Sequence, residues 1–549
     1  GVGRDRPTIV TSFGNPYLLT SFPGAPAYLI AWGGREVSQR AAARALTGLA
    51  PIGGRLPVSI PPYALRGDGV DRGPAAGAPP TAGASAGGAP APAGRRGAGL
   101  SAEPGTVAGR PAVPVRRSPL EADPALVGMD AGALARVDSL IAAAVADSVT
   151  PGAALAIGRH GRLVRLRGYG RLDYPRSTAA AVGGVGAAGD GPRPREPVAA
   201  AIGESTAFAY PVTPGTIYDV ASLTKVVGTT TALMLLVDEG RVDLDRPVVD
   251  YLPWWAGEDP ARRRVSVRQL LLHRGGLPPF ERFYFDIAGR AAYERAIAAL
   301  PLQYVPGRAT VYSDIGFMTL GFLVEAVSGR SLDAFLAERA WRPLGMDDTG
   351  FRPPAARAVR IAPTEVDTIF RHTHVHGVVH DENAYAMGGV AGHAGLFSTA
   401  YDLAVFAHTL LNGGVAPACV PASEPGLICP HPRAEDLRLV DEGTLHAFTR
   451  RWDETASRAL GWDTPSGTSS AGDYFGPRAF GHTGFTGTSV WMDPDLDLFV
   501  VLLTNRVNPT RDNSRHVPLR RAVHDAAALS IVDQAVRVRE DAGRPGADR

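Results

Sequence analysis

The chain has 549 residues, more than one ordinary domain needs, and its 45% hydrophobic and 20% charged residues are typical of a soluble globular protein. A net charge of +2 gives no global field that would select nucleic acid or an anionic membrane. No run of about 18 apolar residues is present, so the sequence predicts no transmembrane segment. The two cysteines, Cys419 and Cys429, lie in one Pro-rich stretch and allow at most one disulfide.

The first 66 residues predict a small α/β segment. Thr8–Val10 is a short β-rich run, and Ala27–Trp32 is typical of a buried strand closed by two glycines. Ser38–Leu49 predicts a helix that ends before Pro51. A segment of roughly 60 residues is marginal as an independent core.

Residues 67–118 are dominated by Gly, Ala and Pro, with almost no large apolar side chains to bury. Such a composition cannot offset the entropy of ordering, so we expect a disordered linker. Residues 175–205 have the same character and predict a disordered insertion within the next domain.

Residues 119–549 predict one larger domain of the α+β class. Asp130 can cap a helix over residues 131–146, and residues 153–169 predict a hairpin that turns at His160 and Gly161. A second hairpin is expected over residues 487–504 and a last helix over residues 519–531. Strands at both ends with a helical middle predict one antiparallel sheet flanked by helices, with a helical lobe beside it.

The strongest chemical signal is Ser222-Leu223-Thr224-Lys225, which opens an apolar helical run ending at Gly240. Positions i and i+3 share a helix face, so Ser222 and Lys225 would point the same way. A serine hydroxyl needs a neighbour that takes its proton, and a lysine can do so only if its pKa is lowered. A serine at a helix start is more often only a cap, so the pair alone is weak evidence.

Two further segments strengthen the catalytic interpretation. Tyr312-Ser313-Asp314 precedes an apolar helix over residues 315–327, and Gly481-His482-Thr483-Gly484 lies at a predicted strand edge. Together the three segments resemble the serine β-lactamase and penicillin-binding peptidase superfamily, and most closely its class C β-lactamase and esterase branch. The resemblance covers about residues 120–531 and includes supporting segments at 270–278 and 392–399.

The resemblance implies a role for each matching residue. Ser222 would be the acylated nucleophile, Lys225 its base partner and Tyr312 a shared acid/base. His482, Thr483 and Gly484 would line the site opposite, and the backbone N–H groups of Ser222 and Phe485 would form the oxyanion hole. His393 and Asp314 would border the substrate.

Asp314 departs from the family pattern, which has asparagine there. A carboxylate loses the amide donor and, unless it is protonated or paired with Lys225, adds negative charge. His482 replaces the usual lysine with a side chain largely neutral at pH 7. Both changes lower the positive potential near Ser222. The sequence therefore predicts a preference for neutral esters or amides over anionic β-lactams.

Residues 8–63 carry a second resemblance, to the tail of the C-terminal domain of glycoside hydrolase family 3. The stretch Pro51–Ser59 is its recognisable part. In that family a catalytic barrel precedes this segment, and this sequence has none of it, which counts against glycosidase activity of this chain.

His372, His374, His376 and His380 invite a metal interpretation, but no acidic or cysteine partner falls at metal-ligand spacing, so we expect no metal and no cofactor. Glu365 and Asp381 are better explained as structural than as cleft residues.

The sequence thus predicts a serine acyl hydrolase acting on an ester or a D-amino-acid amide or peptide. The expected partner is a small-molecule or peptidoglycan-derived acyl substrate, outside the cytoplasm in the periplasm or extracellular space. The alternatives are a true β-lactamase, a fragment of a β-N-acetylglucosaminidase fusion, and a non-catalytic penicillin-binding module. The sequence does not determine the oligomeric state.

Overall fold

The computed structural model describes residues 9–13, 27–31, 113, 115–118, 120–174, 210–420, 424–452 and 457–541. The chain divides into two compact units, Gly1–Ala112 and Val113–Arg549. In the first, strands β1 (Ile9–Phe13) and β2 (Ala27–Ala31) pair in parallel. Strand β2 lies within the predicted strand, and β1 overlaps the predicted β-rich run and extends three residues beyond it. The helix expected over 38–49, most of the linker and the insertion at 175–205 lie outside the described residues.

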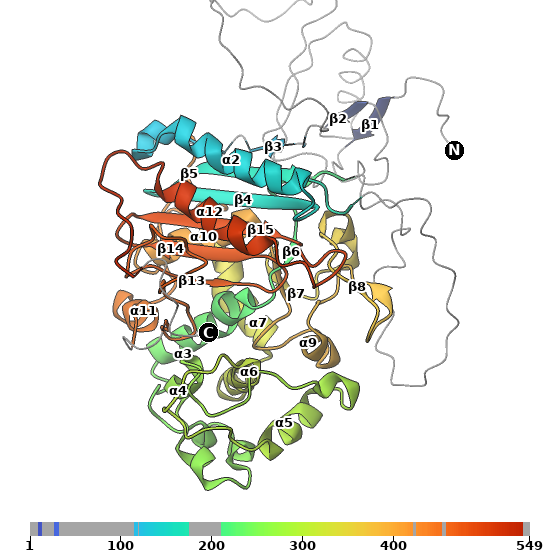
Figure 1. Cartoon of the computed structure of the whole chain (residues 1–549), viewed down its shortest axis with the longest axis vertical. Coiled ribbons are helices and arrows are strands. Elements are labelled where there is room, and N and C mark those ends of the chain that lie inside the picture. The colour runs from blue at the N-terminus through green and yellow to red at the C-terminus, as the bar shows by residue number, and fades with distance from the viewer. Residues whose placement is uncertain are drawn as a thin grey trace, which may run out of the picture. The chain divides into compact units, whose positions relative to one another are not determined.

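The second unit is built on one antiparallel sheet (Figure 1). Its strand order is β13 (Phe480–Thr483), β14 (Ser489–Asp493), β15 (Leu498–Thr504), β4 (Gly152–Arg159), β5 (Arg162–Gly170) and β3 (Val115–Arg117). Strand β15 pairs with β4, so the two ends of the domain meet at the centre of the sheet. The predicted α+β class and both predicted hairpins are confirmed.

Strand β3 corrects one predicted boundary. Residues 115–117 fall inside the predicted linker, yet they pair with β5, and the Ser118 N–H donates to the Leu166 carbonyl at 3.1 Å. The composition hid this strand, because prolines at 114 and 119 flank it and the Gly- and Ala-rich stretch precedes it. A domain that began at residue 119 would lose its edge strand.

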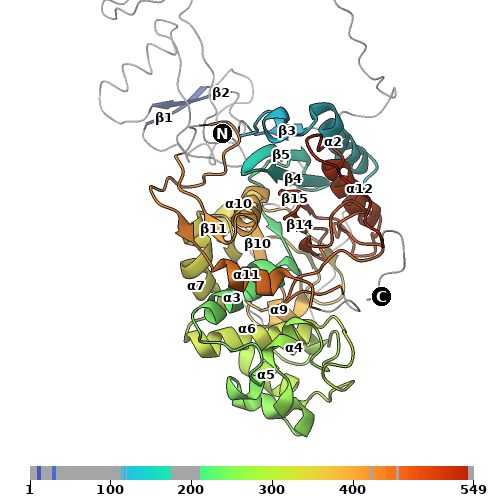
Figure 2. The same ribbon diagram turned by 90° about the vertical axis from the view of Figure 1, so that its left-hand side faces the viewer.

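Helices cover both faces of the sheet (Figure 2). Helices α2 (Ala131–Ala146) and α12 (His516–Ala528) share a core with Leu155 and Ile157, whereas Ala154 and Ala156 belong to the core that contains α10 (Ala400–Leu411). Successive side chains of β4 point to opposite faces of the sheet, so this one strand contributes to the cores on both sides. Asp130 caps α2 as predicted, accepting the Ala133 N–H at 2.6 Å, while the last helix begins three residues before the predicted start.

The helical lobe lies beside the sheet. Its elements are the π-helix Thr224–Thr230, α3 (Thr231–Asp238), α4 (Val267–Leu271), α5 (Arg290–Ala299), α6 (Asp314–Ser328), α7 (Leu332–Leu336), α8 (Arg342–Leu344), α9 (Glu382–Ala386) and α11 (Glu442–Thr449). A small sheet of β6 (Tyr218–Asp219), β10 (Leu396–Ser398) and β7 (Gly350–Phe351) connects this lobe with the residues before Ser222.

Among its described residues, the second unit contains one disulfide and no single helix that could cross a membrane. Cys419 and Cys429 form the one disulfide that the sequence allows, with Cα atoms 5.8 Å apart. Within the described part of the chain, no single helix has the length and apolar character to cross a membrane, although α6 together with the bent segment Leu332–Leu344 satisfies both criteria.

Candidate active site

Ser222 lies in the turn between β6 and the π-helix, and Lys225 follows one turn later. The Lys225 ammonium donates to Ser222 Oγ at 3.0 Å, so the spacing in the sequence does place the two side chains together. Ala221, just before the serine, has a φ of +48°, a conformation that costs energy for any residue with a side chain. Such a strained turn has to be held by its surroundings.

Lys225 is completely buried. Its ammonium also donates to the His393 carbonyl at 3.0 Å and pairs with Asp314 Oδ1 at 2.7 Å. Burial alone would lower the pKa of Lys225, but the attraction of Asp314 and Tyr312 outweighs it and raises that pKa above its ordinary value. The lowered pKa that a lysine base requires is therefore absent, and the resting side chain is an ammonium paired with a carboxylate.

Tyr312 precedes α6, whose first turn is capped by the Ser313 hydroxyl oxygen accepting the Gly316 N–H at 3.2 Å. The Tyr312 ring lies 4.6 Å from that of His273 and 5.9 Å from that of His482, and the Ser313 N–H donates to His273 Nδ1 at 3.0 Å. Burial raises the pKa of the Tyr312 phenol, while the nearby Lys225 acts in the opposite direction. The phenol is thus an oriented, protonated donor.

His482 lies on β13, opposite Val490 of β14. Burial, followed by Arg458 and Lys225, lowers the pKa of His482 well below its usual value, so the ring is neutral at pH 7. Its Nδ1 lies 2.7 Å from the Thr483 carbonyl oxygen, which can only accept, so Nδ1 carries the hydrogen. The Nε2 atom consequently carries the lone pair, and it is buried without a hydrogen-bond partner among the described residues.

A cavity of about 350 Å³ opens beside Ser222. Its lining consists of Ser222, Tyr312, Arg458, Asp463, His482, Thr483, Gly484, Phe485, Arg506, His516 and Arg520. Three of these are arginines, which changes the electrostatic expectation from the sequence. Asp314 and His482 do remove positive charge, but three guanidinium groups restore it on the cavity wall.

The three arginines are held differently. Arg520 donates to the carbonyls of Gly484 and Thr488 at 2.6 and 2.8 Å, and Arg506 donates to the Phe485 carbonyl at 2.8 Å. Arg458 lies 5.4 Å from the Tyr312 ring centroid, and its Nη1 is 3.8 Å from Asp463 Oδ1. Burial beside Arg506 lowers the pKa of Arg520 to about 9, which still leaves it charged at pH 7.

Phe485, the expected second oxyanion donor, follows β13 and lines the same cavity. Its side chain is 48% exposed, and the Arg506 guanidinium lies 4.4 Å from its ring centroid. Thr483 and Gly484 complete this edge of the cavity. The structure therefore brings Ser222, Tyr312, His482, Thr483, Gly484 and Phe485 together, with Lys225 buried against the serine.

Two expected substrate contacts have other neighbours. Asp314 faces Lys225 and does not line the cavity. His393 contributes its carbonyl to Lys225, while its ring is buried and its Nε2 lies 2.9 Å from Asp381 Oδ1. Asp381 caps α9 by accepting the Ala384 N–H at 2.8 Å, and although burial opposes it, His393 holds the pKa of Asp381 below its ordinary value. Both residues act on Lys225 or its supports.

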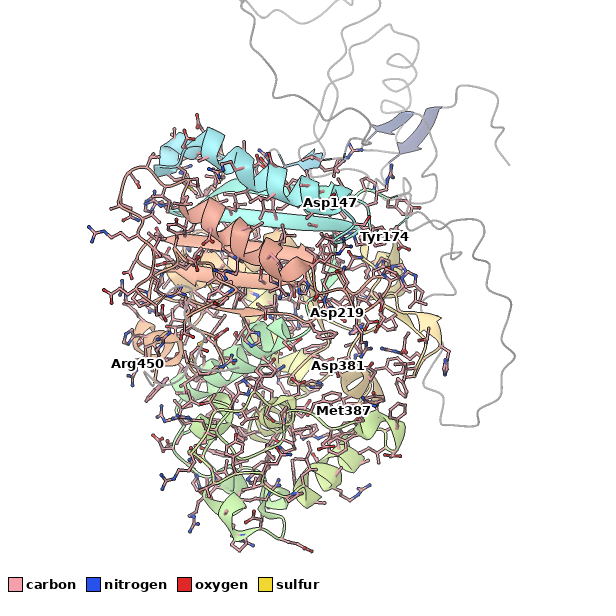
Figure 3. The ribbon with its side chains drawn as sticks, in the orientation of Figure 1. Asp147, Tyr174, Asp219, Asp381, Met387 and Arg450 are labelled. Atoms are coloured by element: carbon pink, nitrogen blue, oxygen red, sulfur yellow. A yellow bond between two sulfur atoms is a disulfide. The ribbon has the colours of Figure 1, made fainter. Side chains whose placement is uncertain are left out.

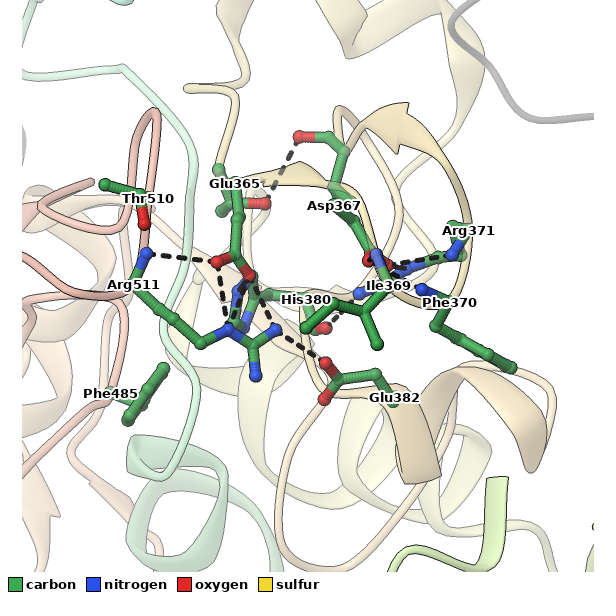
Figure 4. Close-up of polar contacts among 12 residues, drawn as sticks. Glu365, Asp367, Ile369, Phe370, Arg371, His380, Glu382, Phe485, Thr510 and Arg511 are labelled. Atoms are coloured by element: carbon green, nitrogen blue, oxygen red, sulfur yellow. Dashed lines mark hydrogen bonds and ion pairs between the residues drawn. The ribbon is translucent and has the colours of Figure 1, made fainter. Parts of the chain in front are cut away.

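The four histidines at 372–380 are dispersed. His374 Nε2 and His376 Nε2 lie within hydrogen-bond distance of the carbonyls of Thr364 and Ile361, and His380 Nε2 is 3.0 Å from Glu365 Oε2. Glu365 and Glu382 are both buried, and both form ion pairs with Arg511 (Figure 4). No group of three His, Cys, Asp or Glu residues in the described ranges could hold a metal ion.

Sequence reasoning missed Arg458, Arg506 and Arg520. None lies in a motif: Arg458 precedes β13, Arg506 follows β15 and Arg520 is on α12. Only the run of basic residues near positions 515–521 hinted at a positive wall, and nothing in the sequence indicated its place.

A family model described as "Beta-lactamase" matches residues 137–525. The chain belongs to the β-lactamase family. The match starts after the first unit, so the resemblance of residues 8–63 to a glycoside hydrolase tail stays a prediction.

Curated relatives extend this assignment. A protein named "Putative D-alanyl-D-alanine carboxypeptidase" from Escherichia coli (strain K12) is 35% identical over 321 residues, covering 54% of this chain and 70% of that protein. The Salmonella typhimurium (strain LT2) protein of the same name is 33% identical over 332 residues, covering 55% and 72%.

Solved structures agree on the fold. A class C β-lactamase superposes with a TM-score of 0.51 at 17% identity, covering 72% of this chain and 98% of that one. EstCE1, "a hydrolase with promiscuous acyltransferase activity", gives 0.50 at 20% identity, covering 72% and 99%. These likenesses establish the β-lactamase-like architecture.

Proposed function

We propose that this hydrolase works through a Ser222 acyl-enzyme and releases a C-terminal residue from a D-alanyl-D-alanine type peptide, with related amides and esters as further substrates. The observation that carries the proposal is the 3.0 Å contact between Lys225 Nζ and Ser222 Oγ beside a cavity with three arginines. The carboxypeptidase names of the relatives favour the peptide over a simple ester.

Lys225 and Asp314 would remove the serine proton as one unit. Because Lys225 carries a proton already, it can accept another only as it passes one to Asp314 Oδ1, 2.7 Å away. Ser222 Oγ then attacks the carbonyl carbon, and the developing oxyanion would receive the backbone N–H groups of Ser222 and Phe485. In the next step Tyr312 protonates the departing nitrogen and recovers its proton from the lysine pair. The net transfer is one proton from Ser222 to the leaving amine, and a water molecule that loses its proton to the same groups then cleaves the acyl-serine bond.

The arginines explain why a carboxypeptidase is preferred over a neutral esterase. A peptide substrate ends in a carboxylate on its leaving side, and arginine is the side chain best suited to bind a planar carboxylate. A substrate derived from peptidoglycan would place the enzyme outside the cytoplasm, in keeping with the expected localisation.

The decisive experiment is intact-mass analysis of the protein after a fluorophosphonate, followed by assays with an acylated peptide ending in D-alanyl-D-alanine. We expect a single adduct on the wild type and none on Ser222→Ala, with release of D-alanine by the wild type only. An adduct on Ser222→Ala would show that another residue is the nucleophile. Labelling of Ser222 without peptide cleavage would retain the nucleophile and reject this substrate class.

A further inference from the structure

Asp219 lies in β6, three residues before Ser222, and is only 2% exposed. Figure 3 labels it between the sheet and the helical lobe. It makes three hydrogen bonds: Oδ1 accepts the Ala221 N–H at 2.8 Å, Oδ2 accepts the His380 N–H at 2.7 Å, and its backbone carbonyl accepts the Thr486 hydroxyl at 2.7 Å. It does not line the cavity, so it cannot contact the substrate there.

The first bond fixes the turn before the nucleophile. Ala221 has a φ of +48°, which an alanine adopts only when the surrounding structure over-determines it. The carboxylate holds the Ala221 N–H directly, and the direction of the next N–H, that of Ser222, depends on this turn. One of the two expected oxyanion donors is therefore oriented by Asp219.

The other two bonds reach the second donor. Thr486 directly follows Phe485, so the bond from its hydroxyl to the Asp219 carbonyl anchors to β6 the residue next to the second donor. Thr488 adds a parallel bond from its hydroxyl to the Val220 carbonyl at 3.0 Å. The backbone N–H of His380 donates to Asp219, and the His380 ring stacks on the Phe485 ring with centroids 5.8 Å apart.

We propose that Asp219 is a positioning residue that holds both backbone donors of the oxyanion hole in one fixed geometry. The inference rests on the proposed function, because it presupposes an oxyanion formed at Ser222. Donors of this kind are effective only when they are preorganised, so that no reorganisation is needed as charge develops. One buried residue supplies such preorganisation, because its carboxylate holds the turn before Ser222 and its backbone carbonyl accepts the Thr486 hydroxyl on the other side of the hole.

A second buried aspartate provides a matched control. Asp493 is fully buried, and its carboxylate accepts the N–H groups of Gly476, Asp495 and Leu496 at 2.6, 2.9 and 3.2 Å. It lies at the end of β14, at the turn into β15, and contributes nothing to the cavity. Burial raises the pKa of both aspartates above the ordinary value, so the two sites differ in location rather than in chemistry.

The test compares Asp219→Asn with Asp493→Asn. Asparagine keeps the shape and one acceptor oxygen, but its amide N–H group faces a backbone N–H. For Asp219→Asn we expect kcat to fall about 100-fold, as when one oxyanion donor is lost, with KM within about threefold of wild type. Affinity for phenylboronic acid, whose serine adduct mimics the tetrahedral intermediate, should fall by a similar factor. Asp493→Asn should keep kcat and boronate affinity, whatever it does to the unfolding temperature.

The outcomes separate the inference from the proposed function. If the fluorophosphonate does not label Ser222 in the wild type, the proposed function fails, and the inference fails with it. If Ser222 is labelled but Asp219→Asn retains wild-type kcat, or loses kcat without losing boronate affinity, only the inference is wrong.

A second variant serves if Asp219→Asn does not fold. Thr486→Val removes one hydroxyl and keeps the side-chain shape, and we expect a five- to tenfold loss in both kcat and boronate affinity. A folded Thr486→Val protein that matches the wild type in both measurements overturns the proposal.

Discussion

Positive charge lies near Ser222 in two places, a single buried lysine and three arginines on the cavity wall, and the two differ in their surroundings. In the lysine site, Lys225 is completely buried and neutralised by Asp314 at 2.7 Å, next to Tyr312. In the arginine wall, Arg458, Arg506 and Arg520 face a shared cavity of about 350 Å³. The first arrangement suits moving a proton, because its charges are matched and held close. The second suits binding an anion, because its charge exceeds what one nearby Asp463 can neutralise.

The largest effect should follow from breaking the lysine site. Lys225→Met leaves Asp314 without its counter-charge, and removing one partner of a buried pair costs about 3–5 kcal/mol. Turnover should fall by about 1,000-fold or more. Urea unfolding and peptide hydrolysis would measure the two losses.

The double variant Lys225→Met with Asp314→Leu is the control. Replacing both charges with apolar groups should recover most of the stability and none of the activity. If the double variant is as unstable as the single one, the pair is not the source of the lost free energy.

Asp314→Asn tests the lysine site more finely, since it removes the carboxylate charge and keeps the size of the side chain. Without the carboxylate, burial dominates and the pKa of Lys225 should fall, so the lysine itself would have to be neutral to accept the serine proton. We expect kcat/KM at pH 7 to fall about 100-fold and to rise with pH, following the titration of Lys225. A pH profile and rate identical to wild type would contradict a shared role of Lys225 and Asp314.

The sequence predicts the lysine site far better than the arginine wall, for a physical reason. Ser222 and Lys225 are related by helix geometry alone, so local periodicity brings them together. The sheet and both hairpins likewise follow from alternation and turn residues, such as His160 and Gly161. The arginine wall comes from three separate elements, and only tertiary packing brings them together. The sign of the Lys225 pKa shift could not be predicted either, because it depends on a contact with α6.

A buried histidine away from the cavity, His524, should make the stability of the protein depend on pH. His524 of α12 is fully buried, and burial lowers its pKa to about 4, so the folded protein resists protonation while the unfolded chain takes up a proton below about pH 6.5. Its contribution to stability is thus lost as the pH falls from 6.5 towards 4, by about 2 kcal/mol between pH 7.5 and pH 5. His524→Leu should remove that part of the slope in urea unfolding at the two pH values. An unchanged slope would mean that His524 accepts a proton in the folded state.

The smallest effect, and the one that decides what the arginine wall is for, should come from Arg458→Gln. If the wall binds a substrate carboxylate, losing one guanidinium should raise KM for a peptide ending in D-alanyl-D-alanine about tenfold, or about 1.4 kcal/mol. The KM for p-nitrophenyl butyrate, which carries no carboxylate, should stay within about twofold of the wild-type value.

Arg450→Gln is the matched control, because Arg450 is exposed, stacks on Trp452 at 3.8 Å and does not line the cavity. Equal losses on both substrates would show that Arg458 supports Tyr312 rather than the carboxylate. A wild type that hydrolyses the ester more efficiently than the peptide would restore the neutral-substrate preference that Asp314 and His482 suggested.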